Sequence, residues 1–305
     1  MSFSNDVRKE ICSSVNDKDK RFACLYGMLL FSRTLTREHI CFQSESSISA
    51  GLFGELFRSV FHVELSCREN VRRNDMVLYC YDITDTELIG KVFVKYHFDE
   101  MQRKLDSEII ATNSLGVFTA GVFLACGSVN DPAKEYHLEF SALIAELADD
   151  LVMLLGDIGV SAGKVVRRGQ YIVYIKDSES IEDTLTFIGA QQCTLELMNV
   201  KIYKDVRNKA NRIRNCDAAN IDKVLNAAIK QRNDIKLIAS VIGLDSLSDE
   251  LREVAELRLE NSDMSLQEIG DSLTVPISRS GVNHRFKKLS RIAEELRSGG
   301  AKNEK

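Results

Sequence analysis

The stretch SLQEIGDSLTVPISRSGVNHRFKKLSRIAEELR, residues 265–297, decides the fold of the C-terminal part of this 305-residue chain. Ser265 and Glu268 have the S-x-x-E spacing of a capping box, in which each side chain satisfies a free N–H of the first helical turn. Pro276 cannot continue that helix, because proline has no N–H and disfavours the α conformation in the residue before it. Ser278 can cap the next helix. The stretch therefore predicts a short helix, a tight turn and a longer second helix.

The longer helix has an apolar face and a basic face. Its apolar residues recur at helical spacing and form one continuous stripe: Val282, Phe286, Leu289, Ala293 and Leu296. The opposite face is polar and basic. A short helix, a tight turn and a basic second helix are typical of a helix-turn-helix, whose second helix enters the major groove of DNA.

The basic face supplies the candidate interface residues. They are Ser278, Arg279, Ser280, Asn283, His284, Arg285, Lys287, Lys288 and Arg291. Arg279 and Asn283, with Ser280 and His284, have donors and acceptors suited to base edges. Lys287, Lys288 and Arg291 are placed for phosphates, which supply affinity rather than sequence reading. A basic amphipathic helix can equally dock on an acidic protein, and a lone exposed histidine is often only a surface residue.

Charge is unevenly distributed along the chain. Residues 201–305 carry 20 basic and 16 acidic residues, a net charge of +4, whereas residues 1–200 have a net charge of −9. Residues 274–293 contain five lysines and arginines and no acid. A basic stretch without acids in an otherwise acidic chain favours a phosphate-binding surface. The two parts of the chain are therefore expected to have different partners.

The first two hundred residues repeat one pattern of elements. The first copy is expected to have helices at 20–32, 47–63 and 84–98, a strand at 39–44, and two strands within 63–83 around the polar turn 72–75. The second is expected to have helices at 117–126, 143–158 and 180–189, a strand at 136–140, and two strands within 163–176 around 167–170. This pattern indicates a duplicated α/β unit.

Each copy opens with an apolar helix that has glycine at its centre, LYGMLLFSR at 25–33 and TAGVFLACG at 119–127. Glycine within a helix costs about 1 kcal/mol relative to alanine, so Gly27 and Gly121 indicate a close approach of two backbones. Two such helices packed about a pseudo-twofold axis, with the strands forming a saddle, resemble the LAGLIDADG homing-endonuclease fold. In active members of that fold an acid near the end of each helix binds a divalent metal.

The matching positions here are Ser32 and Cys126. Metal-assisted phosphodiester hydrolysis needs carboxylates, and neither serine nor a buried cysteine is a ligand for a hard cation. The resemblance therefore implies a nuclease fold without nuclease activity. Arginines in the β-turn regions could form a basic rim on the saddle or could simply be solvated: Arg68, Arg72, Arg73, Arg167 and Arg168.

Composition limits the remaining classes of function. Hydrophobic residues make up 44% and charged residues 28% of the chain, as in ordinary globular proteins. The eight cysteines form no C-x-x-C pair and do not cluster with the five histidines in the sequence, so no metal site and no cofactor are predicted. Apolar runs too short to span a membrane, and a polar N-terminus, predict a cytoplasmic protein without a membrane partner. The expected DNA binding implies association with the nucleoid, and no small-molecule partner is expected.

The fold class expected is α+β: a duplicated LAGLIDADG-type α/β saddle followed by an all-α helix-turn-helix domain. Residues 1–210 are expected to form the first domain, with repeats at about 20–98 and 115–190. The polar segment 211–220 is interpreted as the boundary, 218–298 as the second domain with its motif at 265–297, and 299–305 as a disordered tail.

Residues 265–297, above all PISRSGVNHR at 276–285, closely resemble the C-terminal end of the WhiA family, and FSNDVRKEI at 3–11 also matches. The resemblance covers essentially the whole chain. It implies a non-enzymatic regulator of transcription that binds double-stranded DNA and acts in cell division, chromosome segregation and, in some lineages, sporulation. Another regulator or a cell-division protein is the alternative partner of domain one. A LAGLIDADG-type endonuclease using displaced acids, and a protein-docking adaptor, stay as rival functions.

Overall fold

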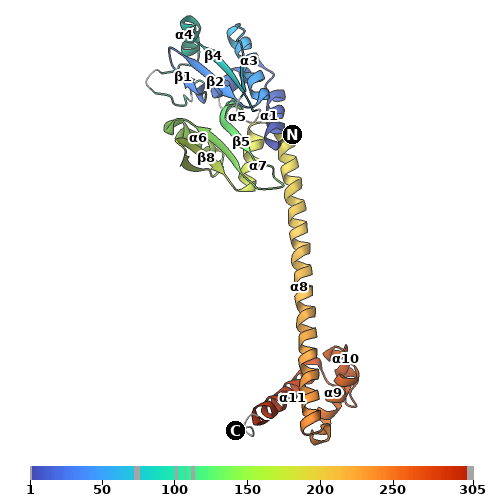
Figure 1. The fold of residues 1–305 in the computed structure, drawn as a ribbon. Helices are drawn as coiled ribbons and strands as arrows, with labels where there is room; N and C mark the ends of the chain where they lie inside the picture. Colours follow the sequence, from blue (N-terminus) through green and yellow to red (C-terminus); the bar gives the residue numbers. More distant parts are fainter. Residues whose placement is uncertain (1, 72–75, 100–101, 107, 111–113, 301–305) are drawn as a thin grey trace. The chain divides into compact units, whose positions relative to one another are not determined.

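The computed structural model describes residues 2–71, 76–99, 102–106, 108–110 and 114–300. The chain forms two compact units, Met1–Asp205 and Val206–Lys305 (Figure 1). The boundary between them falls within one helix, α8 (Gln191–Val241). Among the described residues, no helix combines the length and the apolar character that crossing a membrane requires.

The N-terminal unit contains the same order of elements twice, as the sequence predicts. The first copy comprises α2 (Lys18–Leu30), β1 (Thr34–Leu35), β2 (Ile40–Ser44), α3 (Ser47–Phe61), β3 (Arg68–Val71), β4 (Val77–Ile83) and α4 (Thr86–Lys95). The second comprises α5 (Leu115–Cys126), β5 (Gly127–Val129), β6 (Leu138–Ala142), α6 (Ala145–Asp157), β7 (Gly163–Arg167), β8 (Gln170–Ile175) and α7 (Ser178–Phe187). The short strands β1 and β5 were not predicted.

The duplication extends to the topology and register of the two sheets. Their strand orders are β1-β2-β4-β3 and β5-β6-β8-β7, and all neighbouring strands are antiparallel. Cys41 on β2 lies opposite Asp82 on β4, and at the same register position Glu139 on β6 lies opposite Tyr174 on β8. Residues at matching register positions of the central strands, β2 and β4 in one sheet and β6 and β8 in the other, are therefore counterparts.

The two glycine-containing helices pack closely against each other. A Cβ atom at Gly121 of α5 would lie 2.1 Å from the carbonyl oxygen of Cys24 on α2, and one at Gly27 would lie 2.4 Å from that of Phe118 on α5. Only glycine leaves room for this backbone contact. The predicted close approach of the two helices is therefore confirmed, and the core of the unit lies around them.

The strands of the first sheet alternate between a core face and an opposite face. Ile40 and Phe42 belong to the hydrophobic core, and the Phe42 ring stacks on Phe53 of α3 with centroids 4.2 Å apart. Side chains alternate along a strand, so Cys41 and Gln43 lie on the face directed away from α3. This second face carries polar and ionisable groups.

An N-terminal helix that was not predicted, α1 (Phe3–Ser14), links distant parts of this unit. The Arg8 guanidinium donates to the carbonyl oxygen of Gly127 over 2.7 Å. The Glu10 carboxylate accepts hydrogen bonds from the backbone N–H groups of Gln192, at 2.6 Å, and Cys193, at 3.0 Å. These N–H groups lie in the first turn of α8, where a negative charge is favourable.

The C-terminal unit is helical. It contains the end of α8, a 3-10 turn at Leu244–Ser246, α9 (Asp249–Glu260), α10 (Leu266–Asp271) and α11 (Arg279–Gly300). These elements enclose a core of their own, formed by Ile235, Ile238, Leu247, Val254, Ala255, Ile269, Leu273, Val282, Phe286, Leu289 and Ala293. The apolar stripe predicted for the last helix supplies four of the core residues.

Two predicted boundaries differ from the structure. Residues 211–220 lie inside the continuous helix α8 instead of interrupting it. The segment NRIRNCDAAN is polar but contains neither proline nor glycine, so its intrinsic cost in a helix is small. The last helix extends to Gly300, two residues into the segment 299–305 that was interpreted as a disordered tail. Residues 301–305 lie outside the described residues.

Candidate nucleic-acid interface

The first helix of the predicted motif, α10, begins with the capping box that the sequence indicates. The Ser265 hydroxyl accepts a hydrogen bond from the Glu268 N–H over 3.2 Å, and the Glu268 carboxylate accepts one from the Ser265 N–H over 2.6 Å. The bond from the Ser265 N–H lowers the pKa of Glu268. Both bonds fix the residue at which α10 begins.

Hydrogen bonds from backbone N–H groups hold the turn between α10 and α11 in place. The Ile277 N–H donates to the carbonyl oxygen of Gly270 over 3.2 Å. The Thr274 N–H donates to the Glu253 carboxylate of α9 over 2.6 Å, which lowers the pKa of Glu253. Gly270 allows the turn to come close, because a Cβ there would lie 2.3 Å from the Ile277 carbonyl oxygen.

The variant Gly270→Ala is expected to lower the free energy of unfolding of the C-terminal unit by about 1–3 kcal/mol, because its new methyl group has to displace backbone. Thermal unfolding followed by circular dichroism measures this change. Gln267→Ala, at an exposed position on the same helix, is the control and should stay within about 0.5 kcal/mol of the original protein. Equal stability of the two variants would contradict the proposed role of the close turn.

The second helix presents most of the predicted residues to solvent. Val282, Phe286 and Leu289 are buried on its core side. The exposed residues at the helix start and along its outer face are Ser278, Arg279, Ser280, Asn283, His284, Lys287, Lys288 and Arg291. The Ser278 hydroxyl accepts a hydrogen bond from the Gly281 N–H over 3.4 Å, which makes Ser278 a cap of the helix as predicted.

Arg285 has a different environment from the other basic residues of α11. Its guanidinium lies 3.5 Å from the Glu250 carboxylate of α9, and only 16% of its side chain is exposed. The structure therefore separates Arg285 from the exposed face on which the other eight candidates lie. It connects α9 to α11 and is less accessible to a ligand.

Arg258 is a buried residue that contacts both the loop before α10 and the helix α11, a role that sequence patterns did not indicate. The residue is only 2% exposed, and its guanidinium lies 5.3 Å from the centre of the Phe286 ring. It donates hydrogen bonds to the carbonyl oxygens of Met264, at 2.6 Å, and Ser262, at 3.3 Å. Burial lowers its pKa. Arg258 thus fixes the loop before α10 against α11.

In the N-terminal unit, the two degenerate nuclease positions lie at the ends of α2 and α5. Ser32 is buried, and its hydroxyl donates to the Thr34 carbonyl oxygen over 3.1 Å. The Cys126 thiol donates to the Val122 carbonyl oxygen over 3.4 Å. Burial raises the pKa of Cys126 to about 12, which keeps it a neutral thiol near pH 7. Neither position supplies a carboxylate for a divalent cation.

Arginine side chains reach the backbone at the ends of both helices. Arg103 donates to the carbonyl oxygens of Ser32, at 2.5 Å, and Leu29, at 3.2 Å, while Arg8 reaches Gly127 after α5. Burial lowers the pKa of Arg103 to about 10, so the guanidinium keeps its charge near neutrality. A positive charge is favourable at a helix C-terminus and repels a metal cation nearby. Sequence patterns do not reveal these long-range contacts.

The arginines of the predicted basic rim lie in different environments. Arg68, Arg167 and Arg168 are all exposed, and Arg68 also forms an ion pair with Asp82. Arg72 and Arg73 lie outside the described residues. Arg168 lines a cavity of about 1050 Å³, together with Arg8 and Arg33. The cavity reaches from the end of α5 to the β7–β8 turn.

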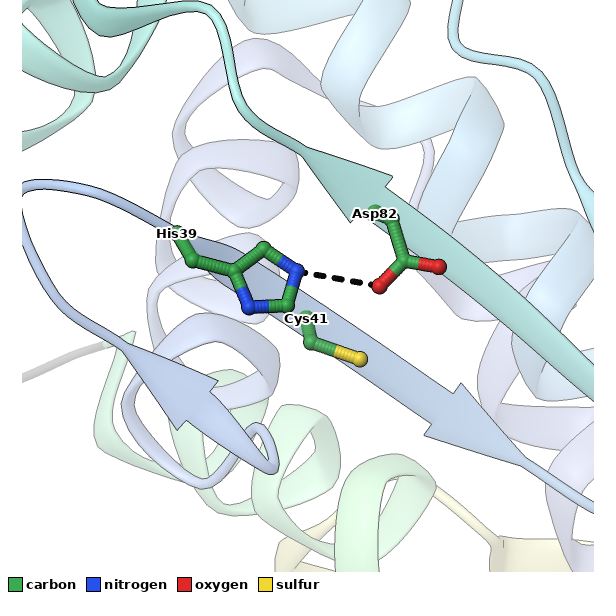
Figure 2. Close-up of side chains that lie close together, drawn as sticks. All are labelled: His39, Cys41 and Asp82. Carbon is green, nitrogen blue, oxygen red and sulfur yellow. Dashed lines mark hydrogen bonds and ion pairs between the residues drawn. The ribbon is translucent and has the colours of Figure 1, made fainter.

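One expectation about the cysteines is wrong. The sequence suggested that histidines and cysteines do not cluster, but the His39 imidazole, the Cys41 thiol and the Asp82 carboxylate lie together on the first sheet (Figure 2). Asp82 is 41 residues from Cys41 in the sequence, and only the β2–β4 register places it opposite. Spacing along the chain could not show this neighbour.

Comparisons with known proteins agree with both units. Residues 210–293 match the family model of the WhiA C-terminal HTH domain, and residues 115–207 match that of the WhiA LAGLIDADG-like domain. The chain is 37% identical to the "Probable cell division protein WhiA" of Clostridium perfringens, with 98% of this chain and 99% of the relative covered. The relative of the same name from Clostridium acetobutylicum is also 37% identical, with 98% and 100% covered.

A solved structure supports the fold of the chain. Full-length DUF199/WhiA from Thermatoga maritima matches with a TM-score of 0.58 and 23% identity, covering 97% of this chain and 99% of that one. The α+β architecture and the two kinds of domain are those predicted from the sequence. Because relatives matched over their full length are more than one third identical to it, this chain belongs to the WhiA family.

Proposed function

We propose that this chain is a non-enzymatic, sequence-specific DNA-binding protein that regulates transcription in cell division and chromosome segregation. The exposed basic face of α11, the second helix of the helix-turn-helix, is the observation that carries this proposal. Its core side is buried, so the basic face is the side available to a major groove. The relatives named as probable cell division proteins support the cellular role.

The interface residues divide by position on α11. Arg279, Ser280, Asn283 and His284 belong to the first two turns, which meet base edges in this class of motif. Lys287, Lys288 and Arg291 follow on the same exposed face and would contact phosphates. Arg285 is proposed to hold α9 and α11 together, because it faces Glu250.

The absence of nuclease activity is supported by the two helix ends. Ser32 and Cys126 stand where active LAGLIDADG enzymes have acids, and Arg103 and Arg8 bring positive charge to the same helix ends. A divalent cation would meet guanidinium groups there instead of carboxylates. The N-terminal unit is then free to contact a protein partner, which its net negative charge over residues 1–200 favours over a broad DNA surface.

Binding and cleavage measured in one assay test this proposal. Purified full-length protein is titrated onto labelled promoter duplexes and random duplexes, with and without Mg²⁺. We expect a shift selective for promoter DNA and no cleavage under either condition. Cleavage that depends on Mg²⁺ would overturn the non-enzymatic assignment, and equal affinity for all duplexes would overturn sequence-specific recognition.

Point variants separate base reading from phosphate contact. Arg279→Ala and Asn283→Ala should each weaken binding by about 1–3 kcal/mol on the specific site and much less on random DNA. Arg279→Lys keeps the charge but loses the two-pronged guanidinium, so it should retain random binding and lose selectivity. If Arg279→Lys binds the specific site as well as the original protein does, Arg279 is not a base-reading residue.

A further inference from the structure

Three possible metal ligands converge on the face of the first sheet that is directed away from α3. Cys41 of β2 lies directly opposite Asp82 of β4, and His39 precedes Cys41 by two residues, so its side chain points to the same face. The His39 ring nitrogen, the Cys41 sulfur and an Asp82 oxygen all lie within 4.8 Å of one another. Figure 2 shows the His39 ring and the Asp82 carboxylate joined by their hydrogen bond, with the Cys41 side chain beside them.

Asp82 interacts with both of the other side chains of this cluster. The His39 Nε2 lies 3.0 Å from Asp82 Oδ1, and Asp82 also interacts with the Cys41 thiol. Partial burial raises the pKa of Asp82, but hydrogen bonds from Cys41 and His39 and the charge of Arg68 outweigh burial and lower it overall. A divalent cation can bind among the same three atoms once the thiol proton is released and the imidazole proton lies on Nδ1.

The backbone holds the cluster in place before any ligand arrives. Cys41 lies in the middle of an antiparallel sheet, between β1 and β4. His39 closes the turn after β1, where its N–H donates to the Thr36 hydroxyl over 3.0 Å. Arg68 holds the second oxygen of Asp82 at 2.5 Å and leaves the first directed at His39. An outer partner of this kind orients a ligating carboxylate.

We propose that His39, Cys41 and Asp82 bind a divalent transition metal, with Zn²⁺ as the best match. Zinc accepts a mixed set of nitrogen, sulfur and oxygen ligands, and a three-ligand site leaves its fourth position to water. A tetrahedral site holds its ligand atoms about 3.3–3.7 Å apart, so side-chain shifts of about 1 Å complete the geometry. On binding, the thiol gives up its proton to solvent, and the neutral imidazole takes the tautomer that carries its proton on Nδ1, which leaves Nε2 free to bind the metal. None of the three residues is one of the two degenerate nuclease positions, Ser32 and Cys126.

The second repeat provides an internal control. His137 and Glu139 occupy the positions equivalent to His39 and Cys41, and Tyr174 replaces Asp82. His137 pairs with Glu139 at 3.0 Å, but no thiol is present at these three positions. Without the sulfur ligand and with a tyrosine side chain in place of the carboxylate, this repeat should not hold zinc. The proposed site is thus specific to the first repeat.

Cobalt substitution tests the site through a signal that requires sulfur ligation. Reduced, metal-free, full-length protein is titrated with Co²⁺, and absorption from thiolate-to-cobalt charge transfer is recorded before Zn²⁺ is added to displace the cobalt. We expect this band to saturate at one equivalent and to disappear with Zn²⁺. Zinc should also raise the unfolding temperature of the N-terminal unit, because only the folded sheet brings the ligands together. The absence of the band would overturn the proposal.

Variants show which thiol and which histidine take part. Cys41→Ser should abolish the band, and His39→Ala should weaken Co²⁺ affinity about tenfold or more, since even outer-partner substitutions cost 10–100-fold. Cys67→Ser removes an exposed thiol and His137→Ala removes the equivalent histidine, and both should retain the band. Circular dichroism checks that each variant is folded. If Cys41→Ser retains the band, or if Cys67→Ser loses it, the metal is bound elsewhere and the proposal is wrong.

Discussion

Replacing Gly121 with alanine should lower the free energy of unfolding of the N-terminal unit by about 3 kcal/mol, near the upper end for overpacking of a core. The added Cβ would lie 2.1 Å from the Cys24 carbonyl oxygen and 3.0 Å from its carbonyl carbon. Both atoms belong to the backbone of α2, so no rotation of a side chain relieves the clash. Helices α2 and α5 would have to move apart and loosen the core around them. Urea unfolding followed by circular dichroism measures the loss.

Gly90→Ala is the matched control for this substitution. Gly90 also lies within a helix of the N-terminal unit, α4, but a Cβ there would have no neighbour within 4 Å. Alanine is the better helix former, so Gly90→Ala should raise the unfolding free energy by about 0.5–1 kcal/mol. The two variants make the same chemical change and are expected to differ in sign. If both stabilise the protein, the helices do not depend on close packing at Gly121.

The triple variant Lys287→Ala, Lys288→Ala, Arg291→Ala should weaken binding to every duplex by about 10- to 100-fold at moderate salt. All three side chains are exposed on α11 and are proposed to contact phosphates. Without these three phosphate contacts, binding releases fewer counterions from the DNA. The slope of log affinity against log salt concentration should therefore become shallower by about 2.7. Fluorescence anisotropy over a series of salt concentrations measures both quantities.

The control for the triple variant removes the same charge from another helix. Lys223, Arg232 and Lys236 are exposed on α8, and their replacement by alanine changes the net charge equally. If binding depends only on overall charge, the two triple variants will weaken it equally. A much larger change in the salt slope for the α11 variant would instead support a defined phosphate-contacting face.

Local sequence was enough to predict the helix-turn-helix. Ser265 and Glu268 lie within one helical turn of each other, so their reciprocal bonds follow from spacing alone. Helical periodicity likewise predicted that Val282, Phe286 and Leu289 would be buried and that the basic face would be exposed. The identity of Arg285 as a basic residue did not predict its environment, because Glu250 comes from another helix.

The same limit applies to the N-terminal unit. Its duplication and the close approach at Gly27 and Gly121 could be read from the order of elements and from two unusual glycines. The contacts at the end of α2 could not be predicted in this way, because the Arg103 guanidinium that bonds to Ser32 lies 71 residues away in the sequence. Polar composition alone gave a misleading boundary at 211–220, where the chain stays helical.

The sequence by itself therefore determined most of the elements, the repeat and the two kinds of domain, because periodicity, capping and glycine placement act within a few residues. Only the tertiary structure decided which ionisable side chains meet. Sheet register brought Asp82 opposite Cys41, and packing placed Arg258 beneath Phe286. Such contacts depend on how segments far apart in the chain are placed. Hydrophobic burial fixes that placement, and the local sequence does not show which polar groups become neighbours as a result.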